Sequence, residues 1–160
     1  MTAFGDRQIM NFEQATIDDA HEILALQKLA YKSEAEIYND FNIPPLHQTL
    51  DEIKAEFTDQ RFLKVCEKGR IVGSVRAYQK EGTCFIGKLI VHPEYQNQGI
   101  GTKLLHKIEN AFNHVVRYEL FTGHKSRKNL YLYEKNGYRI FRRQEVTDDL
   151  IIVFMEKYRV

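Results

Sequence analysis

Residues 89–105 restrict the fold and the ligand of this chain more than any other segment. A short apolar run reaches Pro93, a polar turn follows, and Gly99 and Gly101 open an amphipathic segment. The first N–H groups of a helix have no partners within the helix and lie at the positive end of its dipole. Glycine lacks a Cβ atom, so a phosphate can approach the main chain closely there. The segment therefore predicts a strand, a turn and a helix whose N-terminus binds a diphosphate.

Two common phosphate-binding motifs fit this segment poorly. The dinucleotide fingerprint G-x-G-x-x-G needs a third glycine at the position that Leu104 occupies. The P-loop ends in Gly-Lys followed by Ser or Thr, whereas here Gly101 is followed by Thr102 and then Lys103. Both motifs are therefore disfavoured.

The segment resembles the pyrophosphate loop of the GNAT superfamily of acyl-CoA N-acyltransferases, V-x-P-x-x-[QR]-x-x-G-x-[GA]. The fixed positions of that loop are matched by Val91, Pro93, Gln96, Gly99 and Gly101. A second segment, residues 132–138, resembles the L-Y-E-K-x-G-[FY] signature near the C-terminus of the family. The two segments follow one another in the family's order and spacing, and the resemblance covers about residues 11–158.

Composition predicts one globular domain over residues 10–160, after a flexible N-terminal extension over residues 1–9. The net charge of +1 gives no bulk attraction to nucleic acid or to a membrane, so neither is an expected partner. Apolar runs are too short to span a bilayer, and residues 1–9 do not form a signal peptide. Cys66 and Cys84 lack C-x-x-C spacing, which favours reduced thiols and a cytoplasmic location. The histidines lack metal-ligand spacing, so no metal is expected.

Hydrophobic periodicity and turn residues predict eleven elements in the order β-α-α-β-β-β-α-β-α-β-β. Strands are expected at 11–15, 62–67, 71–79, 83–91, 118–122, 138–146 and 150–157. A first helix is expected to begin at Asp18 and Asp19, and a second runs from a capping box at Thr49 to about residue 57. A third helix follows the two glycines and reaches about residue 113, and a fourth runs from Ser126 to about residue 136. Pro44 and Pro45 are expected to break the chain.

This order suits an α/β (α+β) fold with a mixed, mostly antiparallel central sheet of about seven strands and helices on both faces. It is also the order of the acyl-CoA N-acyltransferase fold, which the resemblance implies.

The resemblance implies direct transfer of an acetyl group from acetyl-CoA to a primary amine of a small molecule or peptide. Acetyl-CoA is then the acyl donor. The oligomeric state is left open, with a homodimer as one alternative. Backbone N–H groups of the loop hold the pyrophosphate, and the preceding strand binds the pantetheine arm and supplies the oxyanion donor. The residues that the resemblance assigns to the cofactor are Leu89, Ile90, Val91, Gln96, Asn97, Gln98, Gly99, Ile100, Gly101, Thr102, Ser126 and Asn129.

Two departures from the family pattern affect these assignments. Many members carry Arg or Lys just before the first glycine, whereas this chain has Asn97 and Gln98, so binding depends more on the backbone. Ser126 stands where members often carry a CoA-contacting Asn, and Asn129 follows three residues later. Either residue serves the cofactor or merely caps the helix. A nearby basic cluster of Lys125, Arg127 and Lys128 is either solvated surface charge or a contact for the 3′-phosphate of CoA.

Tyr133 resembles the family's general acid, which returns a proton to the departing thiolate. The unperturbed pKa of a phenol, about 10, keeps it protonated at neutral pH. The alternative for Tyr133 is a core position on its helix beside Tyr131 and Leu132.

The general base stays open. No Asp or Glu lies on residues 84–91, and Phe121 stands at the position where other relatives carry a Glu on the following strand. Glu119, Glu34 and Glu36 are candidates, and ordered water is another; Glu34, Glu36 and Asp40 are expected to line the amine pocket or to be surface charges of a helix. The missing strand carboxylate also keeps open an alternative function: a non-catalytic acyl-CoA-binding or sensory protein of the same fold.

Overall fold

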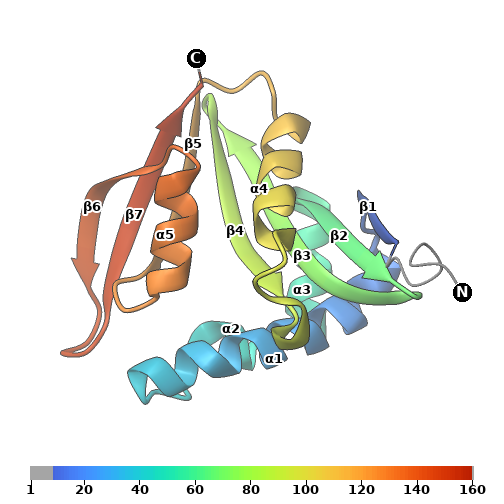
Figure 1. Ribbon diagram of the computed structural model, residues 1–160, viewed down its shortest axis with the longest axis horizontal. Helices are drawn as coiled ribbons and strands as arrows, with labels where there is room; N and C mark the ends of the chain where they lie inside the picture. Colours follow the sequence, from blue (N-terminus) through green and yellow to red (C-terminus); the bar gives the residue numbers. More distant parts are fainter. Residues whose placement is uncertain (1–8, 160) are drawn as a thin grey trace, which may run out of the picture.

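The computed structural model describes residues 9–159, and the expectation of a flexible extension falls almost entirely on residues outside that range. Seven strands form one mixed sheet in the order β1-β2-β3-β4-β5-β7-β6 (Figure 1). Only the β4–β5 pair is parallel. The strands are β1 (Met10–Gln14), β2 (Arg61–Glu67), β3 (Arg70–Lys80), β4 (Thr83–Val91), β5 (Arg117–Gly123), β6 (Arg139–Glu145) and β7 (Ile151–Tyr158).

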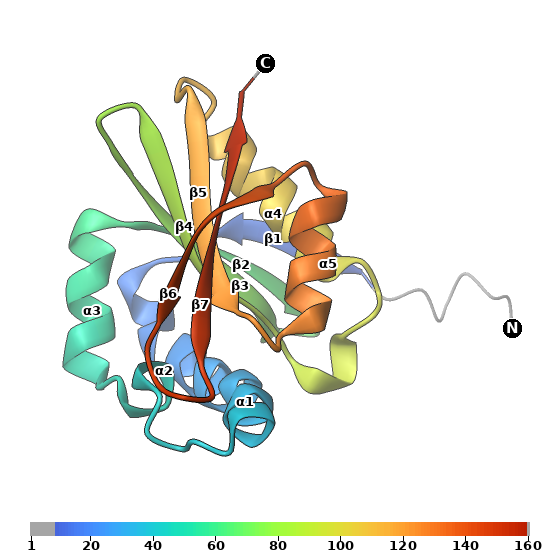
Figure 2. The ribbon, with the colours of Figure 1, turned by 90° about the vertical axis from the view of Figure 1, so that its left-hand side faces the viewer.

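Helices cover both faces of the sheet, as Figure 2 shows. One face carries α1 (Ala20–Tyr38), α2 (Pro44–His47) and α3 (Leu50–Asp59), and the other carries α4 (Ile100–Ala111) and α5 (Arg127–Lys135). Each face has its own core of buried side chains. The expected fold class and element order are therefore confirmed. Among the described helices, none is long and apolar enough to cross a membrane.

Local sequence signals account for most of the helix ends. Thr49 Oγ1 accepts the Glu52 N–H at 3.2 Å and Glu52 Oε1 accepts the Thr49 N–H at 2.9 Å, which is the expected capping box. The prediction that Pro44 and Pro45 break the chain is wrong, because both prolines begin α2. A proline in the first helical positions loses no intrahelical hydrogen bond. Helix α4 ends two residues before the expected residue 113.

The central strands separate after a short stretch of pairing. Strand β4 pairs with β5 only from Thr83 to Phe85, and its edge from residue 86 onward has no strand partner among the described residues. On its other side, the register of β4 with β3 shifts between Ser74 and Arg76, and Lys88 adopts a left-handed conformation at φ 46°. A bulge of this kind bends a strand and increases its twist. The free edge of β4 therefore faces a gap in the middle of the sheet.

Gly73 of β3 allows α4 to pack closely on the sheet, and this generates a prediction about stability. A Cβ atom at Gly73 would lie 2.7 Å from Val65 Cγ1 and 3.1 Å from Leu104 Cδ1, whereas one at Gly87 would meet nothing within 4 Å. We expect Gly73→Ala to lower the free energy of unfolding by about 1–3 kcal/mol, because this core is overfilled by the added methyl group. Gly87→Ala should change it by less than about 1 kcal/mol. Urea denaturation measures both, and equal stabilities would contradict this account of the packing.

Candidate active site

Two cavities lie against the separated strands. The larger, about 950 Å³, is lined mainly by α1, α2, α3 and strands β3, β4, β5 and β7. The smaller, about 720 Å³, is lined by α1, the end of β4, the loop over residues 96–102 (the glycine loop) and α5. Tyr31, Glu34, Leu89 and Asn129 line both cavities. The two cavities therefore meet at the edge of β4, where one ligand can extend toward another.

The glycine loop forms one wall of the smaller cavity. Gly99, at φ 80°, is the N-cap of α4, and no side chain caps the helix. Gln96 Nε2 donates to the Val91 carbonyl oxygen at 3.3 Å, which ties the loop to the end of β4. The cavity is lined by the expected loop residues Gln96, Asn97, Gly99, Ile100, Gly101 and Thr102, whereas Gln98 lines neither cavity. The uncapped N–H groups at the start of α4 are thus available to an anion.

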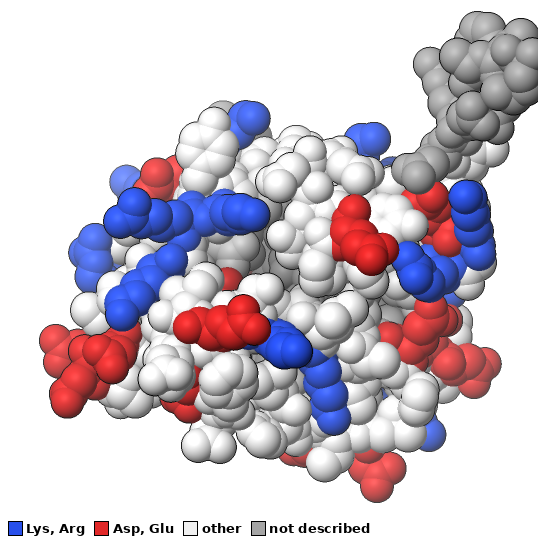
Figure 3. All heavy atoms as spheres, turned by 60° about the horizontal axis from the view of Figure 1, so that its bottom comes forward, with Lys and Arg blue, Asp and Glu red and all other residues white. Residues whose placement is uncertain are grey.

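Positive side chains gather at the opposite wall of this cavity. Lys125, Arg127, Lys128 and Lys135 line it from the start and the end of α5. Figure 3 shows Lys and Arg side chains beside a hollow on this face of the molecule. These cations and the helix N-terminus both favour a ligand with several negative charges.

The end of β4 serves both the core and the cavity. Leu89, Ile90 and Val91 line the smaller cavity, while the Ile90 side chain is buried on the α1 face. Because the β5 side of this segment has no strand partner, its main chain is available for an extended ligand. The backbone of these three residues can therefore bind a ligand while the Ile90 side chain packs in the core.

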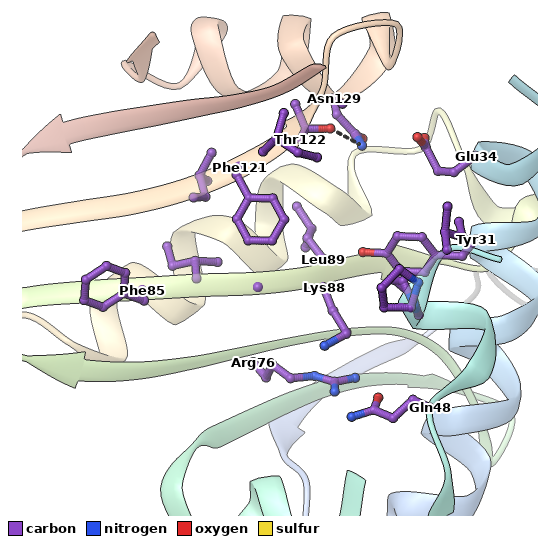
Figure 4. Close-up of a pocket in the computed structure, with 18 of the residues that line it drawn as sticks. Tyr31, Glu34, Gln48, Arg76, Phe85, Lys88, Leu89, Phe121, Thr122 and Asn129 are labelled. Carbon is purple, nitrogen blue, oxygen red and sulfur yellow. Dashed lines mark hydrogen bonds between the residues drawn. The ribbon is translucent and has the colours of Figure 1, made fainter. Parts of the chain in front are cut away.

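Ser126 does not cap α5, although it occupies the N-cap position. Its hydroxyl donates to Glu34 in a short hydrogen bond and lies 3.2 Å from the Tyr38 hydroxyl oxygen. The capping alternative for Ser126 is therefore wrong, since this side chain connects α5 to α1. Asn129 Nδ2 donates to Thr122 Oγ1 at 3.2 Å (Figure 4), and so it joins α5 to the end of β5.

Tyr133 lies on α5 and lines the larger cavity with a side chain that is only 5% exposed. Burial raises the pKa of Tyr133, and the nearby Tyr31 and Glu34 act in the same direction. The hydroxyl therefore stays protonated well above neutral pH. Tyr133 is therefore a buried core residue that also lines the cavity, and both interpretations of Tyr133 remain compatible with its position.

The candidate bases and Asp40 occupy different places. Glu34 lines both cavities, whereas Glu119 lines only the larger one and is paired with Arg117 Nη2 at 2.8 Å. Glu36 is exposed and lines neither cavity, and Asp40 Oδ1 accepts the Asn42 N–H outside both. Glu34 is thus the carboxylate nearest to the junction of the two cavities.

Sequence reasoning missed a buried polar network under the larger cavity. Arg76, 1% exposed, donates to Glu56 Oε2 and to Gln27 Oε1, both at 2.7 Å. Gln27 is fully buried and also donates to Gln48 Oε1 and to the Pro45 carbonyl oxygen. In the sequence, Gln27 only interrupts an apolar stripe. Two features of the sequence could have indicated the network: Arg76 is a charged residue in the middle of a strand, and Gln27 is a polar residue within the apolar stripe of a helix.

Tyr31 was also missed as a residue of the site, because its spacing fits the apolar stripe of α1. Its hydroxyl points into the space beside Leu89 in Figure 4. Burial raises the pKa of Tyr31 to about 12, and the positive charge of Arg76 opposes that rise. Tyr31 therefore presents a neutral hydroxyl group where the cavities meet.

Solved structures of known fold resemble this chain over most of its length. The PaiA N-acetyltransferase of Thermoplasma acidophilum, solved with coenzyme A, matches with a TM-score of 0.78 at 16% identity and covers 94% of this chain and 99% of that one. The ribosomal-protein-S18-alanine N-acetyltransferase of Escherichia coli also gives 0.78, at 14% identity and 94% coverage of both chains. At these identities the likeness shows a shared fold.

Sequence comparisons identify relatives directly. The UPF0157 protein YqkA of Bacillus subtilis is 29% identical over 132 residues, which cover 82% of this chain, but the chain spans only 37% of that protein. The family model of the acetyltransferase (GNAT) domain matches residues 58–140, slightly more than half of the sequence. The match contains β3, β4, the glycine loop and α5. The chain therefore belongs to the GNAT acetyltransferase family.

Proposed function

We propose that this protein is an N-acetyltransferase that moves an acetyl group from acetyl-CoA directly to a primary amine of a small molecule or peptide. Family membership supports acetyl transfer, and the amine acceptor is the finer part of the proposal. The observation that carries it is the uncapped N-terminus of α4 beside the unpaired edge of β4. Together they suit a diphosphate joined to an extended arm, which is the shape of CoA.

In this proposal the smaller cavity holds CoA and the larger cavity holds the acceptor. The pyrophosphate lies on the backbone from Asn97 to Thr102, the pantetheine arm follows residues 89–91, and Ser126 and Asn129 flank the arm. Lys125, Arg127 and Lys128 are then positioned for the 3′-phosphate. The thioester reaches the junction of the cavities, and an N–H group of β4 stabilises the oxyanion.

The reaction forms one bond and breaks one bond. The neutral amine attacks the thioester carbonyl, the new C–N bond forms, and the C–S bond then breaks to release the CoA thiolate. The amine nitrogen gives one proton to ordered water, and Tyr133 donates one proton to the thiolate. Burial raises the pKa of Tyr133, so the phenol carries a proton at neutral pH.

Acetyl-CoA turnover separates this function from that of a non-catalytic acyl-CoA-binding or sensory protein. Amino acids, polyamines, aminoglycosides and peptide N-termini are offered as acceptors, and free thiol release is measured. We expect acceptor-dependent thiol release with at least one class. Tight acetyl-CoA binding without turnover by any amine would favour the sensory alternative.

Gly101→Val tests the diphosphate site. A Cβ atom at Gly101 meets only Leu132 Cδ2, at 3.4 Å, so the fold should tolerate a larger residue. The branched side chain would occupy the space of the pyrophosphate, and losing hydrogen bonds to a charged group should weaken CoA binding more than about tenfold. Calorimetry measures the affinity, with Gly101→Ala as a smaller step and thermal melting as the control for folding. Unchanged CoA affinity in a folded Gly101→Val protein would exclude this site.

Tyr133→Phe tests the general acid. The variant keeps the ring and removes only the hydroxyl, so kcat should fall by about 10²–10⁴-fold while CoA affinity stays similar. Tyr158→Phe, at an exposed position outside both cavities, is the matched control and should keep full activity. If Tyr133→Phe is as active as the parent protein, Tyr133 is only a core residue.

Removal of a proton from the amine generates a further prediction. We expect no single carboxylate to be indispensable, because the amine can lose its proton to ordered water or arrive neutral. The acidic limb of kcat/KM should then move with the pKa of the amine, measured with two amines of different pKa. Glu34→Gln retains an acceptor for Ser126, so it tests proton transfer separately from the hydrogen bond. Glu119→Gln and Glu36→Gln complete the set. A limb that stays fixed when the amine changes, together with one inactive variant, identifies a dedicated base instead.

A further inference from the structure

One end of the larger cavity carries more positive than negative charge. Arg76 of β3 and Lys88 of β4 both line it, and both approach the carboxylate of Glu56 on α3. Arg76 Nη1 lies 2.7 Å from Glu56 Oε2, and Lys88 Nζ lies 3.7 Å from Glu56 Oε1. One carboxylate therefore faces two cations, which leaves a surplus of one positive charge.

Arg76 has a hydrogen-bond donor without a partner. Both terminal nitrogens of its guanidinium donate to Glu56 and Gln27, but Nε is buried and has no partner among the described residues. A buried donor that is left unsatisfied costs free energy, especially on a charged group. Arg76 lines the cavity but is only 1% exposed, so an acceptor on a ligand reaches Nε when the side chain shifts slightly toward the cavity.

Lys88 lies at the same place, and its ammonium group has no hydrogen-bond partner among the described residues. Its 3.7 Å separation from Glu56 is longer than a hydrogen bond. Burial and the positive charge of Arg76 lower the pKa of Lys88. Figure 4 shows the Lys88 side chain extending from β4 toward the guanidinium of Arg76. An anion between the two cations would relieve their repulsion and restore solvation to both.

The other carboxylates that line the cavity do not cancel this charge. Glu119 is paired with Arg117, Glu52 accepts the Thr49 N–H at the start of α3, and Glu34 accepts from Ser126 at the junction. Only Glu56 lies within ion-pair distance of Arg76 or Lys88 among the described residues. The surplus charge at this end is therefore local.

The rest of the cavity suits an apolar group. Its walls include the side chains of Ile43, Pro44, Phe85, Phe121, Ile152 and Phe154. Lys88 directly precedes Leu89, the strand residue at the junction of the cavities, and a strand advances only about 3.3 Å per residue. The cationic end thus lies within one or two residues of the point where the amine must meet the thioester.

We propose that the acceptor is an amine that also bears a carboxylate and an apolar body, such as a free amino acid with an aromatic or aliphatic side chain. The carboxylate pairs with the Lys88 ammonium group, and one of its oxygens accepts from Arg76 Nε when that side chain shifts toward the cavity. The single surplus charge at this end of the cavity suits a monoanion. This inference rests on the proposed function, since it names the substrate class of that reaction.

Three amines that differ only at the carboxylate test the proposal by turnover with acetyl-CoA. They are phenylalanine, phenylalaninamide and phenethylamine. We expect kcat/KM for phenylalanine to exceed that of each of the other two by at least about tenfold, since hydrogen bonds to charged groups are the stronger ones. In Lys88→Gln this preference should fall to within about threefold, mainly through a higher KM. Lys80→Gln, at an exposed position outside both cavities, should keep the full preference.

A binding measurement separates failure of this proposal from failure of the proposed function. N-acetylphenylalanine and its amide are titrated into the protein with CoA present. The acid should bind at least about tenfold more tightly than the amide, and Lys88→Gln should remove that difference. Discrimination by binding without any turnover would leave the carboxylate site in place and overturn the transferase function. If phenethylamine is turned over as fast as phenylalanine, the transferase function stands and the carboxylate site is overturned.

A phosphonate analogue of phenylalanine decides the chemistry of the anion. If the phosphonate is preferred to the carboxylate in turnover or in binding, the site takes a dianion and the carboxylate assignment is overturned. If neither anion is preferred to its neutral counterpart in either measurement, Arg76 and Lys88 act only in the polar network beneath the cavity.

Discussion

The early separation of β4 from β5 is the constraint on which the rest of this site depends. The two strands share only three register positions, and the bulge at Lys88 turns the remaining part of β4 away from a regular ladder. Unpaired backbone groups in the interior of a protein need other partners. Both cavities open where those partners are missing, and α5 and α1 approach the gap from opposite faces of the sheet. A continuous ladder here would satisfy the backbone and leave no room for an extended ligand.

The polar network of Arg76, Glu56 and Gln27 places charge where the α1 face would otherwise be apolar. It joins β3 to α3 and α1 through hydrogen bonds of 2.7 Å. Arg76 is buried and Glu56 is partly exposed, so removing Glu56 would leave the Arg76 charge buried without its ion-pair partner. The network therefore holds the floor of the larger cavity in one arrangement. A floor of this rigidity is useful to a site that must orient a small acceptor within a wide apolar space.

The sequence was sufficient for the fold, the element order and the position of the turn that precedes α4. Those features follow from local signals: periodicity, the Thr49 capping box, and glycines at Gly99 and Gly101. It was insufficient for Arg76, Gln27 and Tyr31, because their importance depends on contacts between elements that lie far apart along the chain. Ser126 illustrates the same limit, since its place before a helix favours a cap, and only the approach of α1 explains why its hydroxyl turns to Glu34 instead.

The turn of α1 that carries Tyr31 and Glu34 forms part of the wall of both cavities. Because Glu34 is also bonded to Ser126 at the start of α5, a ligand that shifts this turn on one side changes the shape available on the other. Such a shared wall links the two binding equilibria, and linkage is reciprocal: whatever factor CoA contributes to the affinity for the acceptor, the acceptor contributes to the affinity for CoA. In the proposed reaction, the coupling between the two substrates would depend on this one helical turn.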